Sequence, residues 1–296
     1  MKITDSQVHI WQPEQPDRPW PKTGWVPDWA FTPFSAEDLI AEMDAAGVTR
    51  AFLVPPAFEG GRNEYSLEAA ERYKGRFAVM GRLQLSDPSA AEHLEAWKEV
   101  AHGYGMRFAF FLPEQVAQLA SGSVDWLWPL AQRLDIPLMI YPAQHLLKDL
   151  GDIANRYSSL KITIDHMAVG HTEHDRDDAA FPHMEQLLGL ARLPNVAVKA
   201  SALPEFSTQG YPFSNLHAYV RRAIDAFGPE RVFWGTDLTR LNCSYEQAVK
   251  MFTEHMSWLN ERELRLVMDE AVRHWHGWEP AEDGQSTIRH SAGVAG

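Results

Sequence analysis

Near its N-terminus the chain reads Ile3-Thr4-Asp5-Ser6-Gln7-Val8-His9-Ile10, which predicts a strand ending in Gln-x-His. Two later apolar segments also end in polar residues: 161–166 ends in a histidine and 231–237 ends in an aspartate. Polar residues at strand ends that are far apart in the sequence converge most naturally in a barrel, where the carboxyl ends of all strands share one face. The three segments therefore favour a closed barrel with its site on that face.

Short apolar runs alternate with helical patterns along the rest of the chain. The strands are expected at 2–9, 50–55, 77–84, 106–112, 137–141, 161–166, 195–200 and 231–237. The helices are expected at 36–46, 64–74, 88–102, 124–134, 147–157, 183–191, 214–227 and 244–257. Eight strand–helix pairs, with strands apolar on both faces, predict an α/β fold of the (β/α)8 TIM-barrel class. A doubly wound open sheet is the alternative.

The pattern indicates one domain over residues 1–278, followed by a flexible tail at 279–296 that is rich in Gly, Ser and Ala. Residues 259–276 predict one or two closing helices, with the histidines at 274 and 276 at the surface. Two segments lack periodicity. Residues 11–34 are expected to form a long loop over the strand carboxyl ends, and 167–182 a mobile loop after the sixth strand.

Composition excludes several classes of protein. The formal net charge of −13 argues against a nucleic-acid partner. No apolar run approaches the length of a membrane span, and the N-terminus lacks a signal region, so no membrane association and a cytoplasmic location are expected. The single cysteine, Cys243, rules out an internal disulfide and fits a reducing compartment.

Three strand-end residues are the candidates for catalysis. Gln7 and His9 lie two apart on a strand, so both point to the same face. His166 is expected to face the pocket, and the adjacent Asp165 to face the helices. Asp237 leaves an apolar strand, where partial desolvation favours use as a general base. A structural histidine or a turn-capping aspartate is the alternative for each residue alone, but their joint placement favours the catalytic roles.

A second group of residues is suited to holding an anionic substrate. Arginine and lysine inside apolar strands must pair with a carboxylate, either from the protein or from a ligand. Tyr141 ends the fifth strand and can hydrogen-bond a substrate oxygen, or it can simply fill the barrel mouth. The candidates for substrate binding are Gln7, Arg82, Arg107, Tyr141, Lys199 and Arg240.

Other common chemistries lack their motifs. The chain has no Gly-rich phosphate loop and no Gly-x-Ser-x-Gly nucleophile elbow. Cys243 has no adjacent histidine, so a thiolate nucleophile is not expected.

Four short motifs, taken in order, resemble the amidohydrolase superfamily in its "amidohydrolase 2" branch of TIM barrels. They are Asp5-Ser6-Gln7-Val8-His9, Ile164-Asp165-His166, Val198-Lys199-Ala200-Ser201 and Trp234-Gly235-Thr236-Asp237, and the resemblance covers about residues 2–278. The branch includes lactonases of the pyrone-dicarboxylate, sulfomuconolactone and sugar-lactone kinds. It also includes metal-dependent decarboxylases of aromatic and muconate-like acids.

The chain departs from the metal-binding pattern of that family. Gln7 stands where metal-using members have a histidine, and Tyr141 stands where they have the histidine of strand five. A neutral glutamine is a weak ligand and tyrosine usually binds only as phenolate, so no essential metal is expected. If a metal binds, the resemblance gives it His9, His166 and Asp237 as ligands, and a single Zn²⁺ or Mn²⁺ is the alternative to a cofactor-free site.

The residues and the resemblance together predict a hydrolase of the lactonase type that opens a small carboxylated lactone. Asp237 would activate water, while His9 and His166, with Gln7 or Tyr141, would polarise the carbonyl. One alternative is a metal-dependent decarboxylase on the same barrel. Another is a non-catalytic barrel that binds a small acid. The family also implies that the chain can form a homodimer.

Overall fold

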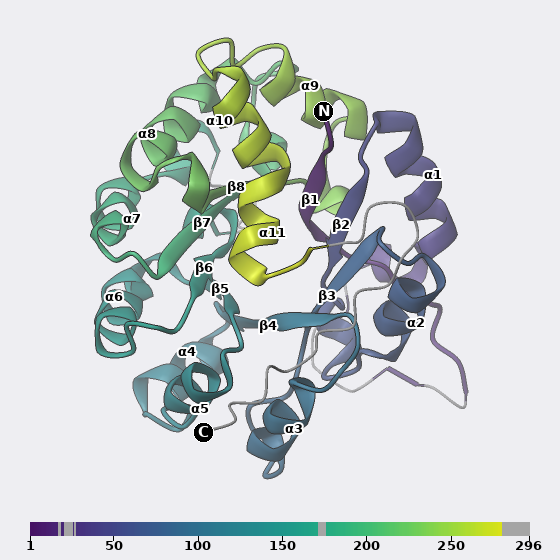
Figure 1. The fold of residues 1–296 in the computed structure, drawn as a ribbon, viewed down its shortest axis with the longest axis vertical. Coiled ribbons are helices and arrows are strands. Elements are labelled where there is room, and N and C mark those ends of the chain that lie inside the picture. Colours follow the sequence, from purple (N-terminus) through teal and green to yellow (C-terminus); the bar gives the residue numbers. More distant parts are fainter. Residues whose placement is uncertain (17–18, 21–25, 27, 171–175, 280–296) are drawn as a thin grey trace, which may run out of the picture.

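The structure is a computed structural model of the 296-residue chain. It describes residues 1–16, 19–20, 26, 28–170 and 176–279 (Figure 1). Parts of the two expected loops, at 17–18, 21–25, 27 and 171–175, and the expected tail from residue 280 onward lie outside the described residues.

Eight parallel strands form one sheet in which each strand pairs with the next along the chain (Figure 1). The strands are β1 Thr4–Val8, β2 Arg50–Leu53, β3 Phe77–Gly81, β4 Gly103–Phe110, β5 Leu138–Pro142, β6 Ile162–Ile164, β7 Val196–Ser201 and β8 Val232–Gly235. The last strand returns to the first, because the backbone N–H of Asp237 donates to the Gln7 carbonyl at 2.8 Å. The predicted (β/α)8 barrel is confirmed.

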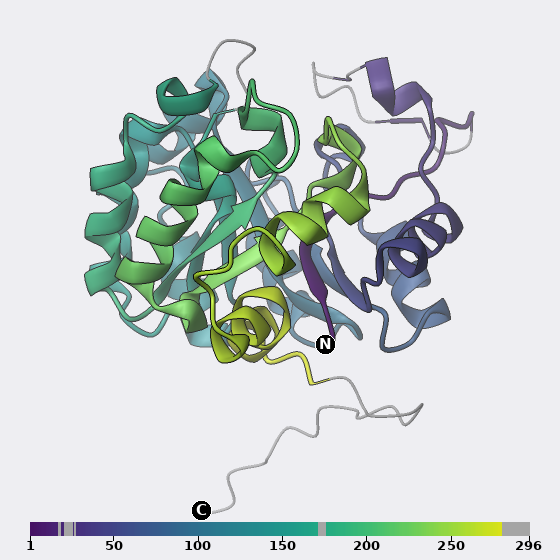
Figure 2. The ribbon, with the colours of Figure 1, turned by 90° about the horizontal axis from the view of Figure 1, so that it is seen from above.

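Helices surround the barrel and fill the connections between strands (Figures 1 and 2). The α-helices are α1 Ala36–Ala46, α2 Glu64–Arg72, α3 Ala90–Trp97, α4 Pro113–Ala120, α5 Leu127–Leu134, α6 Leu147–Arg156, α7 Met184–Gly189, α8 His217–Phe227, α9 Tyr245–Thr253, α10 Glu261–Arg265 and α11 Ala271–His276. Capping residues fix several of their ends. Ser35 and Asp38 form a capping box at the start of α1, and Gly47 ends that helix in the left-handed conformation.

The barrel is closed from the amino ends of its strands by the C-terminal helices. Inside the barrel, Phe52, Met139 and Phe233 pack in one apolar cluster with Val272 of α11. A π-helical turn at Leu266–Glu270 joins α10 to α11, and both helices lie at the same end of the molecule as the N-terminus (Figure 2). The site must therefore open at the opposite end.

The C-terminal histidines do not both lie at the surface, contrary to expectation. His276 is 3% exposed and packs against the ring of Phe52 at a centroid distance of 5.2 Å. His274, two residues earlier and on another face of the helix, has a side chain that is 58% exposed.

The described part of the first loop packs onto the barrel through aromatic residues. Trp11 bridges to Phe34 by a backbone hydrogen bond of 3.0 Å, and its ring meets Phe58 edge to face. No helix in the described residues has the length and apolar composition of a membrane span.

Candidate active site

One cavity of about 300 Å³ lies at the carboxyl ends of the strands. Residues from six strand ends or the loops beyond them line it, as expected for an active site of this fold. Its polar lining comprises His9, Arg82, Arg107, Gln115, Tyr141, Asp237 and Arg240. Six of the nine predicted site residues therefore share one cavity, while Gln7, His166 and Lys199 lie beneath its surface.

Asp237 sits between two histidines at the base of this cavity. His9 Nε2 is 3.1 Å from one carboxylate oxygen, and His166 Nε2 is 3.7 Å from the other. The aspartate is 2% exposed and adopts the left-handed conformation, with φ of 52°, two residues after the end of β8. This conformation turns the carboxylate from the strand into the site, and aspartate and asparagine tolerate it better than most residues.

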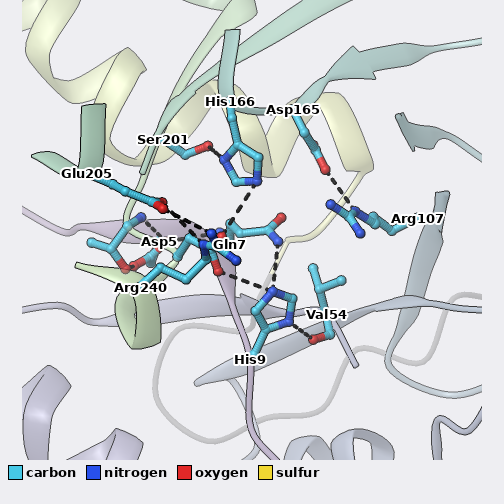
Figure 3. Close-up of polar contacts among 12 residues, drawn as sticks. Asp5, Gln7, His9, Val54, Arg107, Asp165, His166, Ser201, Glu205 and Arg240 are labelled. Atoms are coloured by element: carbon cyan, nitrogen blue, oxygen red, sulfur yellow. Dashed lines mark hydrogen bonds and ion pairs between the residues drawn. The ribbon is translucent and has the colours of Figure 1, made fainter. Parts of the chain in front are cut away.

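The hydrogen bonds of His9 fix which of its nitrogens carries a proton. Nδ1 lies 2.6 Å from the carbonyl oxygen of Val54, and a carbonyl oxygen only accepts, so Nδ1 donates. On the other side of the ring, Gln7 Nε2 lies 3.3 Å from His9 Nε2 (Figure 3). His9 therefore presents Nε2 to both Gln7 and Asp237.

His166 reaches the site because β6 ends abruptly. Residues His166, Met167 and Ala168 all have positive φ, of 51°, 53° and 59°. The resulting turn directs His166 toward Asp237, and its Nδ1 lies 2.8 Å from Ser201 Oγ (Figure 3). The placement of His166 at the site was predicted.

Asp165 does not face the helices, contrary to expectation. It is fully buried, and its two oxygens lie 3.0 Å from Arg107 Nε and 2.8 Å from Lys199 Nζ. Burial alone would raise the pKa of this carboxyl, but the two cations outweigh that effect and lower its pKa to about 2. The Asp165 carboxylate thus forms ion pairs with both Arg107 and Lys199.

The three arginines of the cavity differ in their partners. Arg240 makes a two-pronged pair with Glu205, at 2.9 and 3.2 Å. Arg107 pairs with Asp165 and also lies over the ring of Tyr141, at 5.4 Å from its centroid. Within the described residues, the Arg82 side chain makes no ion pair, and its buried Nε makes no hydrogen bond. Burial, followed by repulsion from Arg107, lowers the pKa of Arg82 well below its usual value.

Tyr141 is held as one wall of the site by aromatic contacts. Its ring stacks on Phe111 at a centroid distance of 5.1 Å and meets the ring of His166 edge to face at 5.3 Å. The ring thus fills the barrel mouth and lines the cavity, while a hydrogen bond from its hydroxyl to a substrate oxygen stays a prediction.

Sequence reasoning missed three supporting residues. Ser201, which contacts His166, shares a strand face with Lys199, and this spacing of two could have identified it. Asp5 offered the same signal, because it lies two residues before Gln7 on the first strand. Glu205 carried no comparable signal. Asp5 accepts hydrogen bonds from the backbone N–H groups of Gln7 and Thr236, and from the hydroxyl of Tyr245. Burial raises its pKa to about 6 despite these bonds.

The side chains at the base of the cavity fit a divalent metal poorly. His9, His166 and Asp237 are the residues that could bind one, but the oxygen of Gln7 accepts a hydrogen bond from the Lys199 ammonium at 2.5 Å. Gln7 therefore turns its NH2 group, which cannot be a ligand, toward His9. The ammonium also interacts electrostatically with Asp237, one of the three candidate ligands.

Comparison with known families agrees with this fold and this arrangement of strand ends. The family described as "Amidohydrolase" matches residues 4–284. The chain belongs to this amidohydrolase family. The resemblance seen in the four motifs is thereby confirmed, and membership supports the expectation of a hydrolase.

Two curated relatives of this amidohydrolase carry lactonase names. The 4-sulfomuconolactone hydrolase of Hydrogenophaga intermedia is 29% identical over 68% of this chain and 64% of its own length. The chain thus spans less than two thirds of that relative. The L-fucono-1,5-lactonase of Burkholderia ambifaria is 29% identical over 79% of each chain.

Solved structures at lower identity show the same fold. An amidohydrolase from Burkholderia multivorans with bound zinc superimposes with a TM-score of 0.76 at 22% identity, over 94% of this chain and 99% of that one. A probable 2-pyrone-4,6-dicarboxylic acid hydrolase from Acinetobacter baumannii with bound citric acid gives 0.73 at 20% identity, over 94% and 100%. A 2,6-dihydroxybenzoate decarboxylase gives 0.68 at 15% identity, over 94% and 99%.

Proposed function

We propose that this amidohydrolase is a lactonase that opens a small lactone bearing a carboxylate or similar acidic group. The observation that carries the proposal is the position of Asp237. Its carboxylate is nearly buried and flanked by His9 and His166 at the base of a cavity lined by three arginines. Both curated relatives described above carry names of lactone hydrolases, which supports this choice within the family.

The proposed reaction needs one base and one water molecule. Asp237 takes a proton from water while the water oxygen attacks the lactone carbonyl carbon. The ring C–O bond then breaks, and the leaving oxygen receives the proton, which gives a hydroxy acid. His9 and His166 flank the carboxylate and can donate a hydrogen bond to the oxyanion once one of them is protonated.

Arg82 favours an acidic substrate over a neutral sugar lactone. In the described structure this guanidinium lines the cavity without a carboxylate partner and lies close enough to Arg107 for mutual repulsion. A substrate carboxylate between Arg82 and Arg107 would relieve that repulsion and supply the missing hydrogen bonds. With a neutral lactone bound, the repulsion between the two arginines would remain, and Arg82 would still lack a carboxylate partner.

A metal is not essential in this proposal. The glutamine oxygen at the base is bonded to Lys199, and no step above requires a Lewis acid. A lactone is also far more reactive than an amide, so water activated by a carboxylate is sufficient. We further propose that Gln7 and Lys199 act below the cavity, where both are fully buried, and that a homodimer is the assembly to test in solution.

The test of the proposed function is hydrolysis of a panel of acidic and neutral lactones by wild type and Asp237→Asn. Asparagine keeps the shape and the left-handed conformation at this position but cannot accept the proton. We expect kcat to fall by about 10²- to 10⁴-fold with an unchanged melting temperature. Asp152→Asn, on the exposed face of α6, is the matched control and should retain full activity. Near-wild-type turnover by Asp237→Asn would exclude this mechanism.

Removal of metal separates the lactonase from the metal-dependent decarboxylase. Lactone hydrolysis should survive exhaustive chelation, measured together with the metal content of the same sample. Loss of activity on chelation that is restored by Zn²⁺ or Mn²⁺ would contradict the metal-free mechanism. Release of CO2 from aromatic acids under those conditions would favour the decarboxylase, and tight binding of an acid without turnover would indicate a binding protein.

A further inference from the structure

Lys199 is a buried cation that lies outside the cavity and makes no direct approach to the reacting groups. Its side chain is 0% exposed, at the inner face of β7. Nζ lies 2.8 Å from Asp165, 2.5 Å from Gln7 Oε1 and 3.4 Å from the carbonyl oxygen of Ser6. A buried ammonium persists only when such acceptors surround it. Through its contact with Gln7, the Lys199–Asp165 ion pair is connected to His9 of the site.

The ammonium decides which way the Gln7 amide is turned. Lys199 can only donate hydrogen bonds, so it must face the oxygen of the amide and not its NH2 group. The NH2 group then faces His9 Nε2, at 3.3 Å. The opposite nitrogen of His9 donates to the Val54 carbonyl. Donors and acceptors therefore alternate in one order along these contacts. Lys199 donates to Asp165 and to the Gln7 oxygen, and the Gln7 NH2 group donates to His9 Nε2.

This direction matters because His9 Nε2 is also 3.1 Å from Asp237. A histidine that donated a hydrogen bond to Asp237 would stabilise the carboxylate and make it a weaker base. With the Gln7 NH2 group facing it, Nε2 acts as an acceptor and does not stabilise the carboxylate. The same nitrogen can then receive the proton that Asp237 takes from water.

We propose that Lys199 is a positioning residue, which acts through the Gln7 amide to keep His9 Nε2 an acceptor beside Asp237. The inference rests on the proposed function for its kinetic consequence, but the orientation of the amide does not depend on turnover. In Lys199→Met the vacated space is bordered by acceptors, namely Asp165 and the Ser6 carbonyl. The amide should then turn its NH2 group toward them and its oxygen toward His9.

The first measurement is the orientation of the amide by NMR. In protein deuterated except at histidine rings and exchangeable groups, wild type should show nuclear Overhauser contacts between the Gln7 side-chain NH2 and the carbon-bound protons of the His9 ring. The His9 signals are assigned by their absence from a His9→Asn variant. These contacts should disappear in Lys199→Met and persist in Lys161→Met, which removes a half-buried lysine that bonds the Trp275 carbonyl instead. Contacts that persist in Lys199→Met would overturn the proposal.

The second measurement is a double-mutant cycle on lactone hydrolysis. Lys199→Met and Gln7→Met should each lower kcat by about tenfold or more, with KM changed less than twofold, because neither residue lines the cavity. If Lys199 acts through Gln7, the double variant should lose no more activity than Gln7→Met alone. Additive losses, or a rise in KM with kcat unchanged, would contradict this role.

The two measurements keep the inference separate from the proposed function. A wild-type protein that opens no lactone in the panel refutes the lactonase, while the NMR contacts still test the role of Lys199. Asp165 keeps Arg107 as a partner in Lys199→Met, so the variant is expected to fold. If it does not fold, Gln7→Met leaves the Lys199–Asp165 pair intact, and an unchanged kcat in that variant would refute the proposal.

Discussion

The surroundings of Arg82 indicate the charge of the ligand that the cavity would bind. The other two arginines of the cavity have protein carboxylates as partners, Asp165 for Arg107 and Glu205 for Arg240. Within the described structure, Arg82 is partly buried and lacks such a partner. It should therefore lower the free energy of unfolding, because no ion pair offsets the free energy lost when the guanidinium leaves water. Such a cost is typically retained where a residue serves binding.

Replacing Arg82 should therefore improve stability and impair binding. For Arg82→Met we expect KM for an acidic lactone to rise about 10- to 100-fold, since a charge-assisted hydrogen bond is worth about 1.5–3 kcal/mol. The free energy of unfolding should rise by about 1 kcal/mol, because a cation that lacks a partner has been removed. Steady-state kinetics and denaturant unfolding measure the two effects. Arg133→Met, on exposed α5, is the control, and an unchanged KM for Arg82→Met would refute the substrate role.

At the scale of residues, sequence reasoning succeeded where a polar residue lies just past the carboxyl end of a strand. His9 and Asp237 are of this kind, and both line the cavity. It was wrong for Asp165, because the alternation of a strand was extended past Ile164, where β6 ends and a left-handed turn begins. Asp5 was missed since its partners, Thr236 and Tyr245, are contributed by the other end of the chain.

The connection after β6 is the most strained element of the site. Three consecutive residues other than glycine adopt the left-handed conformation there, and each costs about 1 kcal/mol relative to a right-handed residue. All three are fully buried, and the packing around them holds the turn that presents His166.

Ala168 offers a direct test of this strain. Ala168→Gly should raise the free energy of unfolding by about 1 kcal/mol, because glycine adopts a φ of 59° without steric penalty. Ala117→Gly, at an exposed position within α4, should lower it by a similar amount since that residue is helical. Guanidinium unfolding curves of the two variants measure both effects. Destabilisation by Ala168→Gly would show that the turn is not strained at this residue.

At the scale of elements, all eight strands could be predicted, and each of the eight expected helices contains an α-helix that begins within three residues of the expected start. Helix α4 was missed because Leu119 is its only buried residue. A helix with most of its surface exposed has little apolar periodicity to detect. Its Gln115 nevertheless lines the cavity.

The molecule as a whole is closed at one end by apolar contacts around a histidine. Burial, aided by repulsion from Lys199 and Lys161, lowers the pKa of His276 to about 3. In the unfolded chain the same group titrates near its ordinary pKa of 6.5. Because the folded pKa is the lower one, the neutral histidine contributes stability above pH 6.5, and this contribution is lost as the pH falls toward 3.

Replacing this histidine should make the protein less sensitive to acid. Between pH 7.5 and pH 5, His276 should cost the wild type about 2 kcal/mol of unfolding free energy, and His276→Leu should lack this part of the pH dependence. The comparison concerns the slope against pH, so any uniform loss from repacking does not affect it. His274→Leu, at an exposed position two residues away, should keep the wild-type slope. Equal slopes for His276→Leu and wild type would contradict the assignment.

The bonds of Asp5 also bear on how the protein is made. This carboxylate of the first strand is completed by Thr236 and Tyr245, which lie 231 and 240 residues later in the chain. Synthesis on a ribosome proceeds from the N-terminus, so β1 cannot pair with β8 until most of the polypeptide has been made. Until then the growing sheet has two exposed edges. The edge formed by β1 is exposed for the longest time, so a chaperone that binds nascent chains would have to cover that strand longest.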